Sequence, residues 1–111
     1  MNIDFKIEEG TLIIMIDGEL DHHNSVTVRE KVDEIFDREK CKNIIFDLNG
    51  MKFMDSSAIG VIMGRYKRSK NVRGKTAIVN TSPQLQKIIN ISGLCKIINI
   101  YTNIQDALQE I

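Results

Sequence analysis

The sequence predicts a single α/β domain in which a mostly parallel sheet carries packed helices. Short apolar runs of strand length alternate along the chain with longer segments whose apolar residues recur at helical spacing. Strands that alternate with helices pair in parallel through right-handed crossover connections. The 111 residues, of which 42% are hydrophobic and 27% charged, suffice for one globular domain and not for two.

The amino-terminal segment predicts a β-hairpin. Residues 3–8 alternate between apolar and charged side chains, which is typical of a half-exposed strand. Glu9-Gly10 indicates a turn, and residues 11–16 (TLIIMI) form an apolar run with no polar face, as in a strand buried on both sides. We therefore expect the first strand to lie at an edge of the sheet and to pair antiparallel with the second.

The rest of the chain alternates between helix and strand. The third predicted helix begins at Ser82-Pro83, an N-cap residue followed by proline, and ends at Gly93. The resulting order is β-β-α-β-α-β-α-β-α over one domain, residues 1–111. The apolar faces of the helices lie within residues 28–36, 58–66, 85–89 and 104–111, and the later strands are residues 44–48, 76–79 and 96–101.

Composition and charge limit the possible functions. The chain has 15 basic and 15 acidic residues, and this balance argues against a nucleic-acid or membrane-surface partner, which would favour a basic excess. The first residues lack the features of a signal peptide, and no run approaches the roughly 20 apolar residues of a membrane span. Cys41 and Cys95 stand apart without metal-ligand spacing. We expect a cytoplasmic protein with two free thiols and with neither a metal nor a cofactor.

Polar residues follow three of the predicted strands. Asp21 comes after the second strand, residues 54–57 (MDSS) after the third, and residues 80–82 (NTS) after the fourth. Parallel strands end at the same edge of a sheet, and this carboxyl edge is where α/β proteins usually carry their sites. We therefore expect these three loops to lie together.

Asp55, Ser56 and Ser57 stand at the predicted start of the second helix. One of the three is needed as the N-cap, because Asp and Ser are favoured there, and the other two then have no structural explanation. A phosphate on a serine at this position would meet the positive end of the helix dipole, so the fold should tolerate it. The segment predicts a phosphorylation switch, on either Ser56 or Ser57, that changes a surface and leaves the fold intact.

Ser56, Gly60 and Gly64 recur at four-residue spacing and share one helix face. Each helical glycine costs about 1 kcal/mol relative to alanine, so the pair needs a reason. One reason is close packing against the sheet or a neighbouring helix, and the other is a flat surface beside Ser56 that lets a partner approach. The same helix carries basic residues that predict a solvated face or one edge of a docking surface: Arg65, Lys67, Arg68, Lys70 and Arg73.

Catalytic motifs explain these loops less well. His22 and His23 are adjacent, so they do not share a helix face, and no third ligand stands near them to complete a metal site. A nucleophilic Ser56 with a histidine and Asp21 lacks the flanking glycines of a nucleophile elbow. Neither a Walker loop nor a GxGxxG fingerprint occurs. We therefore expect an interaction protein and not an enzyme.

Three segments carry a family resemblance. Residues 18–23 (GELDHH), 53–67 (FMDSSAIGVIMGRYK) and 92–98 (SGLCKII) closely resemble the STAS-domain anti-sigma-factor antagonists. They are most similar to the branch that acts on the anti-sigma-F factor of spore-forming bacteria, and the similarity runs in register over nearly the whole chain. The family usually has glycine where this chain has Ala58. A helix-favouring alanine should stiffen the first turn and affect the rate of phosphorylation more than its site.

The resemblance implies a partner-switching mechanism. The dephosphorylated protein would bind an anti-sigma factor that is itself an ATP-dependent serine kinase, and would thereby release sigma factor F for sporulation transcription. The kinase would then phosphorylate Ser56, the phosphoprotein would dissociate, and a separate serine phosphatase would restore it. The alternatives are a STAS scaffold of a general stress-response cascade and a nucleotide-binding domain. We expect a free monomer whose partner surface contains Asp21, His22, Met54, Asp55, Ser57, Gly60 and Arg65.

Overall fold

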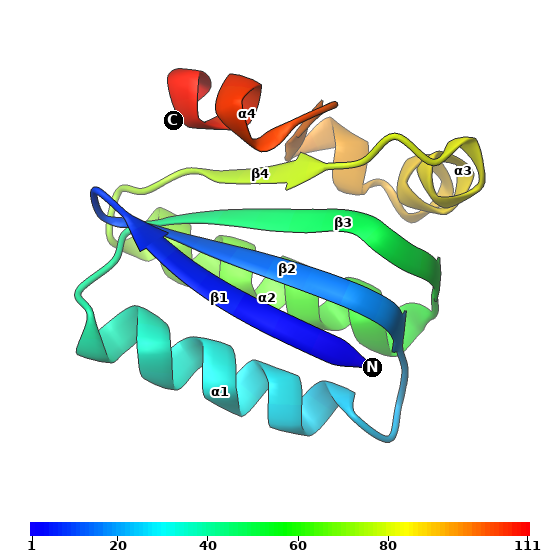
Figure 1. Ribbon diagram of the computed structural model, residues 1–111, viewed down its shortest axis with the longest axis horizontal. Helices are drawn as coiled ribbons and strands as arrows, with labels where there is room; N and C mark the ends of the chain where they lie inside the picture. Colours follow the sequence, from blue (N-terminus) through cyan, green and yellow to red (C-terminus); the bar gives the residue numbers. More distant parts are fainter.

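The computed structural model describes residues 1–111 as a five-stranded sheet with four α-helices and one short 3-10 helix (Figure 1). The order of strands and α-helices is the predicted one. No α-helix of the fold has both the length and the apolar composition needed to cross a membrane. The elements are β1 Asn2–Glu8, β2 Thr11–Leu20, α1 Ser25–Arg38, β3 Asn43–Met54, α2 Ser56–Asn71, β4 Thr76–Val79, α3 Pro83–Ser92, the 3-10 helix Leu94–Lys96, β5 Asn99–Tyr101 and α4 Ile104–Glu110.

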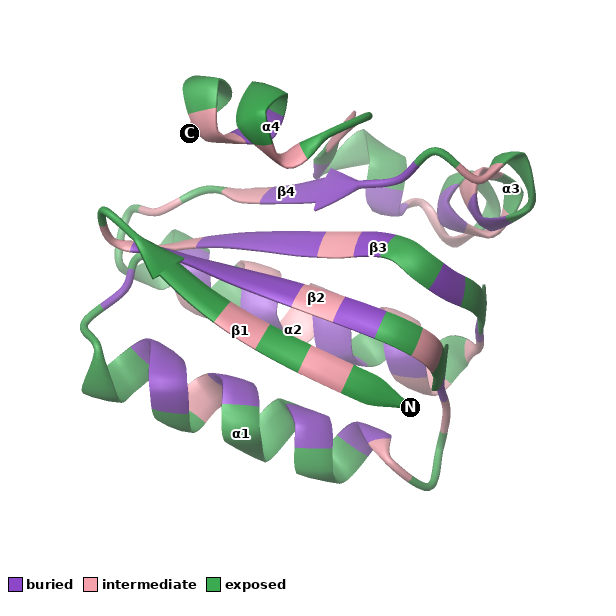
Figure 2. Ribbon diagram, in the orientation of Figure 1, coloured by how far each residue is buried: buried purple, intermediate pink, exposed green.

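The strands lie in sequence order, β1-β2-β3-β4-β5, across the sheet. β1 forms the predicted antiparallel hairpin with β2 at one edge, and the other neighbouring strands pair in parallel. Because parallel neighbours need a crossover, α1 connects β2 to β3, α2 connects β3 to β4, and α3 lies between β4 and β5. β1 is half-exposed as predicted: Ile3 and Phe5 pack against the core, whereas Asp4 and Lys6 are exposed (Figure 2).

Helices cover both faces of the sheet, with α1, α2 and α3 on one face and α4 on the other. Side chains alternate between the two faces along the central strands and so separate two cores. On β3, Ile44, Phe46 and Leu48 enter the larger core together with residues of α1, α2 and α3, whereas Ile45 belongs to the smaller core with Ala107 of α4. The apolar runs of the central strands are therefore buried on both sides, as their sequences predict.

Local helix signals in the sequence are confirmed. The residues of α1 with the predicted apolar spacing, including Val28 and Val32, are buried (Figure 2). The Ser82 hydroxyl caps α3 by accepting the Leu85 N–H at 3.2 Å. Gly93 ends α3 with φ of +85°, a conformation that glycine adopts without strain. Short-range chemistry therefore determines the ends of α3.

Three strand boundaries differ from the prediction. β2 continues to Leu20 and β3 to Met54, because these segments pair with each other although neither shows a strand pattern of side chains. At the other end of the chain, the 3-10 helix replaces the start of the predicted strand 96–101. There the Ile98 N–H donates to the Leu94 carbonyl at 2.9 Å. Local hydrogen bonds therefore confine β5 to Asn99–Tyr101.

The two cysteines are free, as predicted. Cys41 is buried at the end of the connection from α1 to β3, and Cys95 is exposed on the 3-10 helix. Burial raises the pKa of the Cys41 thiol, and the negative charge of Glu39 raises it further. Cys41 therefore stays protonated and serves as an apolar core residue.

An ion-pair cluster ties α1 to α2. Arg65 Nε lies 2.8 Å from Asp33 Oδ1, and Arg68 approaches the same carboxylate at 3.2 Å and that of Asp37 at 2.6 Å. Arg65 is 7% exposed, and its Nη1 donates to the Val61 carbonyl at 3.3 Å. Burial lowers the pKa of the Arg65 guanidinium, and the Asp33 carboxylate opposes this shift. Because a buried cation requires a partner, Asp33 fixes Arg65 inside the contact between the two helices.

Gly74→Ala is expected to lower the free energy of unfolding by about 2–4 kcal/mol, because a Cβ there would collide with the Lys42 carbonyl group and the Ser69 hydroxyl. Urea denaturation followed by circular dichroism measures the change. Gly60→Ala is the matched control: open space surrounds Gly60, so alanine should leave stability unchanged or raise it by up to about 1 kcal/mol. Equal effects in the two variants would contradict the close approach at Gly74.

Arg65→Ala is expected to lower the free energy of unfolding by about 2 kcal/mol, because it removes the ion pair and leaves Asp33 partly buried with only Arg68. Lys67→Ala removes an exposed cation from the same helix and should change stability by less than about 0.5 kcal/mol. Thermal and chemical denaturation of both variants provide the comparison. If Arg65→Ala were as stable as Lys67→Ala, the cluster would not tie the helices together.

Candidate functional site

The register of β2 and β3 brings two acidic loops to one edge of the sheet. Leu20, the last residue of β2, pairs with Met54, the last residue of β3. Asp21 follows the first of these residues and Asp55 the second, so the two loops leave the sheet from neighbouring positions. The structure therefore places the segment around Ser56 beside the segment around Asp21, as predicted for a carboxyl-edge site.

Asp55 is the N-cap of α2. Its Oδ1 accepts the backbone N–H groups of Ser57 at 2.9 Å and Ala58 at 3.1 Å. Ser56 is exposed, Ser57 is half-buried and Ala58 is fully buried in the larger core. Asp55 thus meets the structural need for a cap, and Ser56 is left as the exposed serine at the first position of the helix.

The occupied cap changes the setting expected for a phosphate. The first backbone N–H groups of a helix have no partner within the helix, but Asp55 already accepts those of Ser57 and Ala58. A phosphate on Ser56 would still lie at the favourable end of the helix dipole. It would also be adjacent in sequence to the Asp55 carboxylate, so its charge would add to an acidic surface.

Asp21 orders its own loop. Its Oδ1 accepts the backbone N–H groups of His23 at 2.9 Å and Asn24 at 3.2 Å, and its own N–H donates to Asn24 Oδ1 at 2.9 Å. Such contacts from Asp and Asn side chains stabilise a turn. His22 and His23 are exposed on this turn, with ring centroids 6.1 Å apart in an edge-to-face arrangement. No group of three His, Cys, Asp or Glu side chains is placed to hold a metal ion.

The loop after β4 does not join the two acidic loops. Thr81 donates its backbone N–H and its hydroxyl to Asn49 Oδ1 at 2.8 and 3.0 Å. The end of β3 lies a further five residues along the strand (49 to 54), a length of about 17 Å. The predicted clustering of all three loops is therefore wrong for residues 80–82. β3 continues well beyond Asp47, its last residue paired with β4.

Two residues expected on the partner surface are buried instead. Met54 is 2% exposed and belongs to the larger core. Arg65 is engaged with Asp33 between α1 and α2, so it supports this surface from inside the fold. The remaining candidates are accessible: His22 and Gly60 are exposed, and the other three, Asp21, Asp55 and Ser57, are half-buried.

Phe53 is a surface residue beside the site that the sequence prediction omitted. It is 50% exposed, although the next residue, Met54, is buried. β3 has one more residue than β2 at this point, because Gly18 pairs with Met51 whereas Glu19 pairs with Phe53. Such a bulge disturbs the alternation of strand faces, which is the signal used to assign burial from sequence.

A groove of about 410 Å³ lies between α1 and α2, next to the start of α2. Ser25 and Arg29 of α1 line it together with Ser57, Gly60 and Gly64 of α2. A Cβ atom at either glycine would meet no atom within 4 Å. Close packing therefore does not explain the glycine pair, and the prediction of an open surface is supported.

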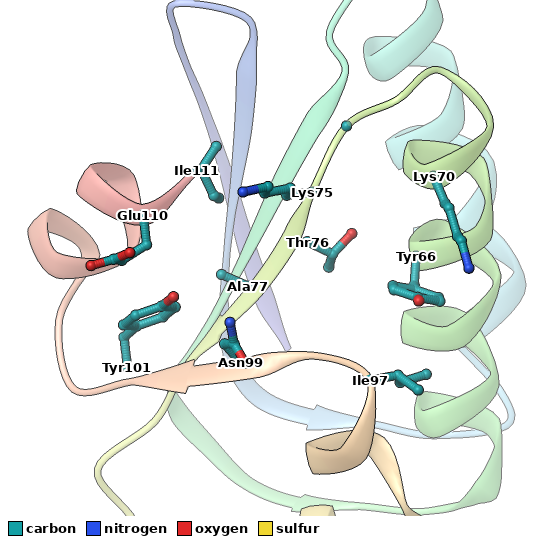
Figure 3. Close-up of a pocket in the computed structure, with 11 residues that line it drawn as sticks. Tyr66, Lys70, Lys75, Thr76, Ala77, Ile97, Asn99, Tyr101, Glu110 and Ile111 are labelled. Carbon is teal, nitrogen blue, oxygen red and sulfur yellow. The ribbon is translucent and has the colours of Figure 1, made fainter.

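A second cavity of about 390 Å³ lies at the amino ends of β4 and β5 (Figure 3). Tyr66 and Lys70 of α2 stand on one side of it, and Tyr101 and Glu110 stand on the other. None of the predicted site residues lines this cavity. It opens at the sheet edge opposite the two acidic loops, so we treat it as separate from the candidate site.

Comparison with known proteins identifies the family. The model for the STAS domain matches residues 2–107. The anti-sigma F factor antagonist of Paenibacillus polymyxa is 42% identical over 113 residues, which cover 100% of this chain and 97% of that protein. The anti-sigma-B factor antagonist of Bacillus subtilis is 29% identical over 98% of both chains.

Solved structures agree with this assignment. The anti-sigma factor antagonist SpoIIAA in its unphosphorylated form has a TM-score of 0.86 at 28% identity, over 98% of this chain and 95% of that chain. SpoIIAA of Bacillus in the phosphorylated form has a TM-score of 0.77 at 28% identity over 98% of both chains. These relatives confirm the predicted fold and the prediction of a regulatory binding protein that is not an enzyme. The chain therefore belongs to the STAS-domain family, and it matches anti-sigma factor antagonists of that family over its whole length.

Proposed function

We propose that this protein is an anti-sigma factor antagonist that binds its anti-sigma factor in the dephosphorylated state and dissociates when Ser56 is phosphorylated. The observation that carries the proposal is the position of Ser56. It is the exposed serine at the first position of α2, on the loop that leaves β3 beside the Asp21 loop. Relatives named as anti-sigma factor antagonists, one of them solved in both phosphorylation states, support this assignment.

Ser56 is a better phosphate acceptor than Ser57. A kinase must bring the acceptor hydroxyl in line with the transferred phosphoryl group, and this requires an accessible side chain. Ser57 is half-buried, lines the groove between α1 and α2, and donates its backbone N–H to Asp55. Ala58 is buried in the larger core, so it leaves the exposed face of Ser56 free.

A phosphate at this position carries enough charge to act as a switch. It adds about −1.5 to −2 charges at neutral pH. We take one acidic group of a bound partner, about 4 Å from the phosphate, and an effective dielectric constant of about 20. Each unit of charge on the phosphate then costs about 4 kcal/mol before screening by salt. Even half of that cost weakens binding by more than about tenfold. The aspartates Asp21 and Asp55 already make the surface acidic, so a phosphate strengthens an existing field.

The partners we propose are an anti-sigma factor that is also a serine kinase using ATP, and a serine phosphatase that reverses the modification. The sigma factor released would be sigma factor F, because identity is higher to the anti-sigma F factor antagonist than to the anti-sigma-B factor antagonist. Full-length similarity to the latter makes a general stress-response cascade the second candidate. Either role places the protein in the cytoplasm as a free monomer and needs no cofactor, membrane or direct nucleic-acid contact.

The proposed partner surface consists of the two acidic loops and the start of α2. Phe53 adds a half-exposed aromatic ring next to this surface, a type of side chain that often anchors protein interfaces. The exposed His22 lies on the Asp21 loop. The complete proposed set is Asp21, His22, Phe53, Asp55, Ser57 and Gly60.

Incubation with the cognate anti-sigma factor and ATP is expected to add one phosphate, on Ser56. Intact-mass spectrometry gives the stoichiometry, and peptide mapping gives the position. Ser56→Ala should remain unmodified, whereas the matched variant Ser57→Ala should still accept one phosphate. A phosphate mapped to Ser57 or Thr81, or no phosphate on the wild-type chain, would overturn the assignment of Ser56.

Substitutions at Ser56 are expected to hold the protein in its two states. Ser56→Ala should bind the anti-sigma factor about as tightly as the unmodified protein. Ser56→Asp should bind at least about tenfold more weakly, because its negative charge would repel an acidic group of the bound partner. Isothermal titration calorimetry measures both affinities. Thr102→Asp adds the same charge to an exposed loop after β5 and serves as the control. Equal binding by Ser56→Asp and Thr102→Asp would show that charge at Ser56 is not the switch.

A further inference from the structure

We propose that the groove between α1 and α2 binds an acidic segment of the anti-sigma factor, and that Arg29 is the residue that selects it. The inference rests on the proposed function, because it concerns the same partner. It extends the proposed partner surface from Ser57 and Gly60 to Arg29 and Gly64. It also adds a charge opposite to that of the two aspartate loops. The shape, the charge and the position of the groove each support it.

The shape of the groove admits an extended chain. Its volume of about 410 Å³ is within the range of sites that bind small ligands or a few side chains. Gly60 and Gly64 leave it open along α2, since a Cβ at either position would meet no protein atom within 4 Å. These glycines weaken the helix without serving its packing, and close approach by a partner gives them a reason.

The groove carries one positive charge that no ion pair of the fold neutralises. Its lining contains two arginines and no carboxylate. Arg65 is paired with Asp33 at 2.8 Å, and Arg68 approaches the same carboxylate. Arg29 is exposed and forms no ion pair, although Asp33 stands one turn further along α1. The guanidinium of Arg29 is therefore free to bind a carboxylate through two parallel N–H donors.

Two hydroxyl groups complete the polar lining. Ser25 of α1 and Ser57 of α2 both line the groove, one on each helix. The Ser25 hydroxyl already donates to the His22 carbonyl at 3.4 Å, so it offers a partner only its acceptor oxygen. The half-buried Ser57 can donate its hydroxyl to a carboxylate oxygen of an acidic segment. A basic segment in the groove would place its positive charge next to that of Arg29, and this repulsion disfavours it.

The position of the groove links it to the phosphorylation switch. Ser57 lines the groove and is the next residue after Ser56. A phosphate on Ser56 adds negative charge beside the groove, where it repels an acidic segment and competes for Arg29. The groove thus explains how the modification releases a partner although α2, its cap and the core are unchanged.

Charge reversal at Arg29 tests the proposal. Arg29→Glu is expected to weaken binding of the unphosphorylated protein to the cognate anti-sigma factor by at least about tenfold, measured by isothermal titration calorimetry at low and moderate salt. Lys31→Glu makes the same charge change on α1 but does not line the groove, and its affinity should stay within about twofold of the wild type. Circular dichroism should show both variants folded. If Arg29→Glu bound like Lys31→Glu, the groove would not be the docking site.

A second variant tests occupancy of the groove without a change in charge. Gly64→Ala adds one methyl group to open space, so the free protein should be as stable as the wild type or more stable, and its affinity should fall by about threefold or more. In a companion experiment, surface Asp and Glu residues of the anti-sigma factor are replaced by lysine. At least one of these variants should bind Arg29→Glu more tightly than the unchanged anti-sigma factor does. If no reversal restores affinity, or if Gly64→Ala binds like the wild type, an acidic segment does not occupy the groove.

These outcomes separate the groove from the proposed function. If Ser56→Asp still loses affinity while Arg29→Glu does not, the function stands and the groove assignment is overturned. If the wild-type protein fails to bind the anti-sigma factor, or if Ser56→Asp binds normally, the proposed function fails, and the assignment of a partner to the groove fails with it. If Arg29→Glu loses affinity, and a lysine in place of a carboxylate of the anti-sigma factor restores it, the proposed function and the groove assignment are both supported.

Discussion

Parallel pairing of β2 with β3 is the constraint on which the candidate site depends. The two strands remain paired as far as Leu20 and Met54, beyond the point where β4 ends. This extension carries the Asp21 and Asp55 loops away from the loop after β4 and delivers them to the same place. The starts of α1 and α2 follow directly from these loops, so one backbone ladder positions the exposed serine, the ordered turn and the groove between the helices.

Contacts within the domain hold the surface formed in this way. Asp55 caps α2 with two hydrogen bonds, and Asp33 holds Arg65 between α1 and α2. Both contacts are internal to the domain, and neither uses the side chain of Ser56. In the proposed switch, a change of charge at Ser56 would alter what the surface attracts without breaking either contact. This is the behaviour expected of a domain that changes partners and not shape.

Local patterns predicted much of this structure and missed its long-range features. The Ser82-Pro83 start, the Gly93 stop and the alternation in β1 depend on neighbouring residues, and the sequence predicts all three correctly. The bulge that exposes Phe53 depends on how two distant segments align, so the periodicity of side chains does not indicate it. For the same reason, Arg65 could not be distinguished in the sequence from an exposed arginine. Its burial becomes evident only when Asp33 is brought against it.

If Ser56 is the phosphorylated residue, as we propose, its exposure limits how sharply the two states can differ. A charge at the surface acts through water and dissolved ions, and at physiological ionic strength its field decays over about 8 Å. The contrast between the proposed phosphorylated form and the unmodified protein would therefore depend partly on the salt content of the surrounding solution. A buried acceptor would resist this dependence but would be closed to an enzyme that adds or removes the group. In the proposed switch, reversibility and sensitivity to the ionic environment would thus have a common origin in one accessible hydroxyl.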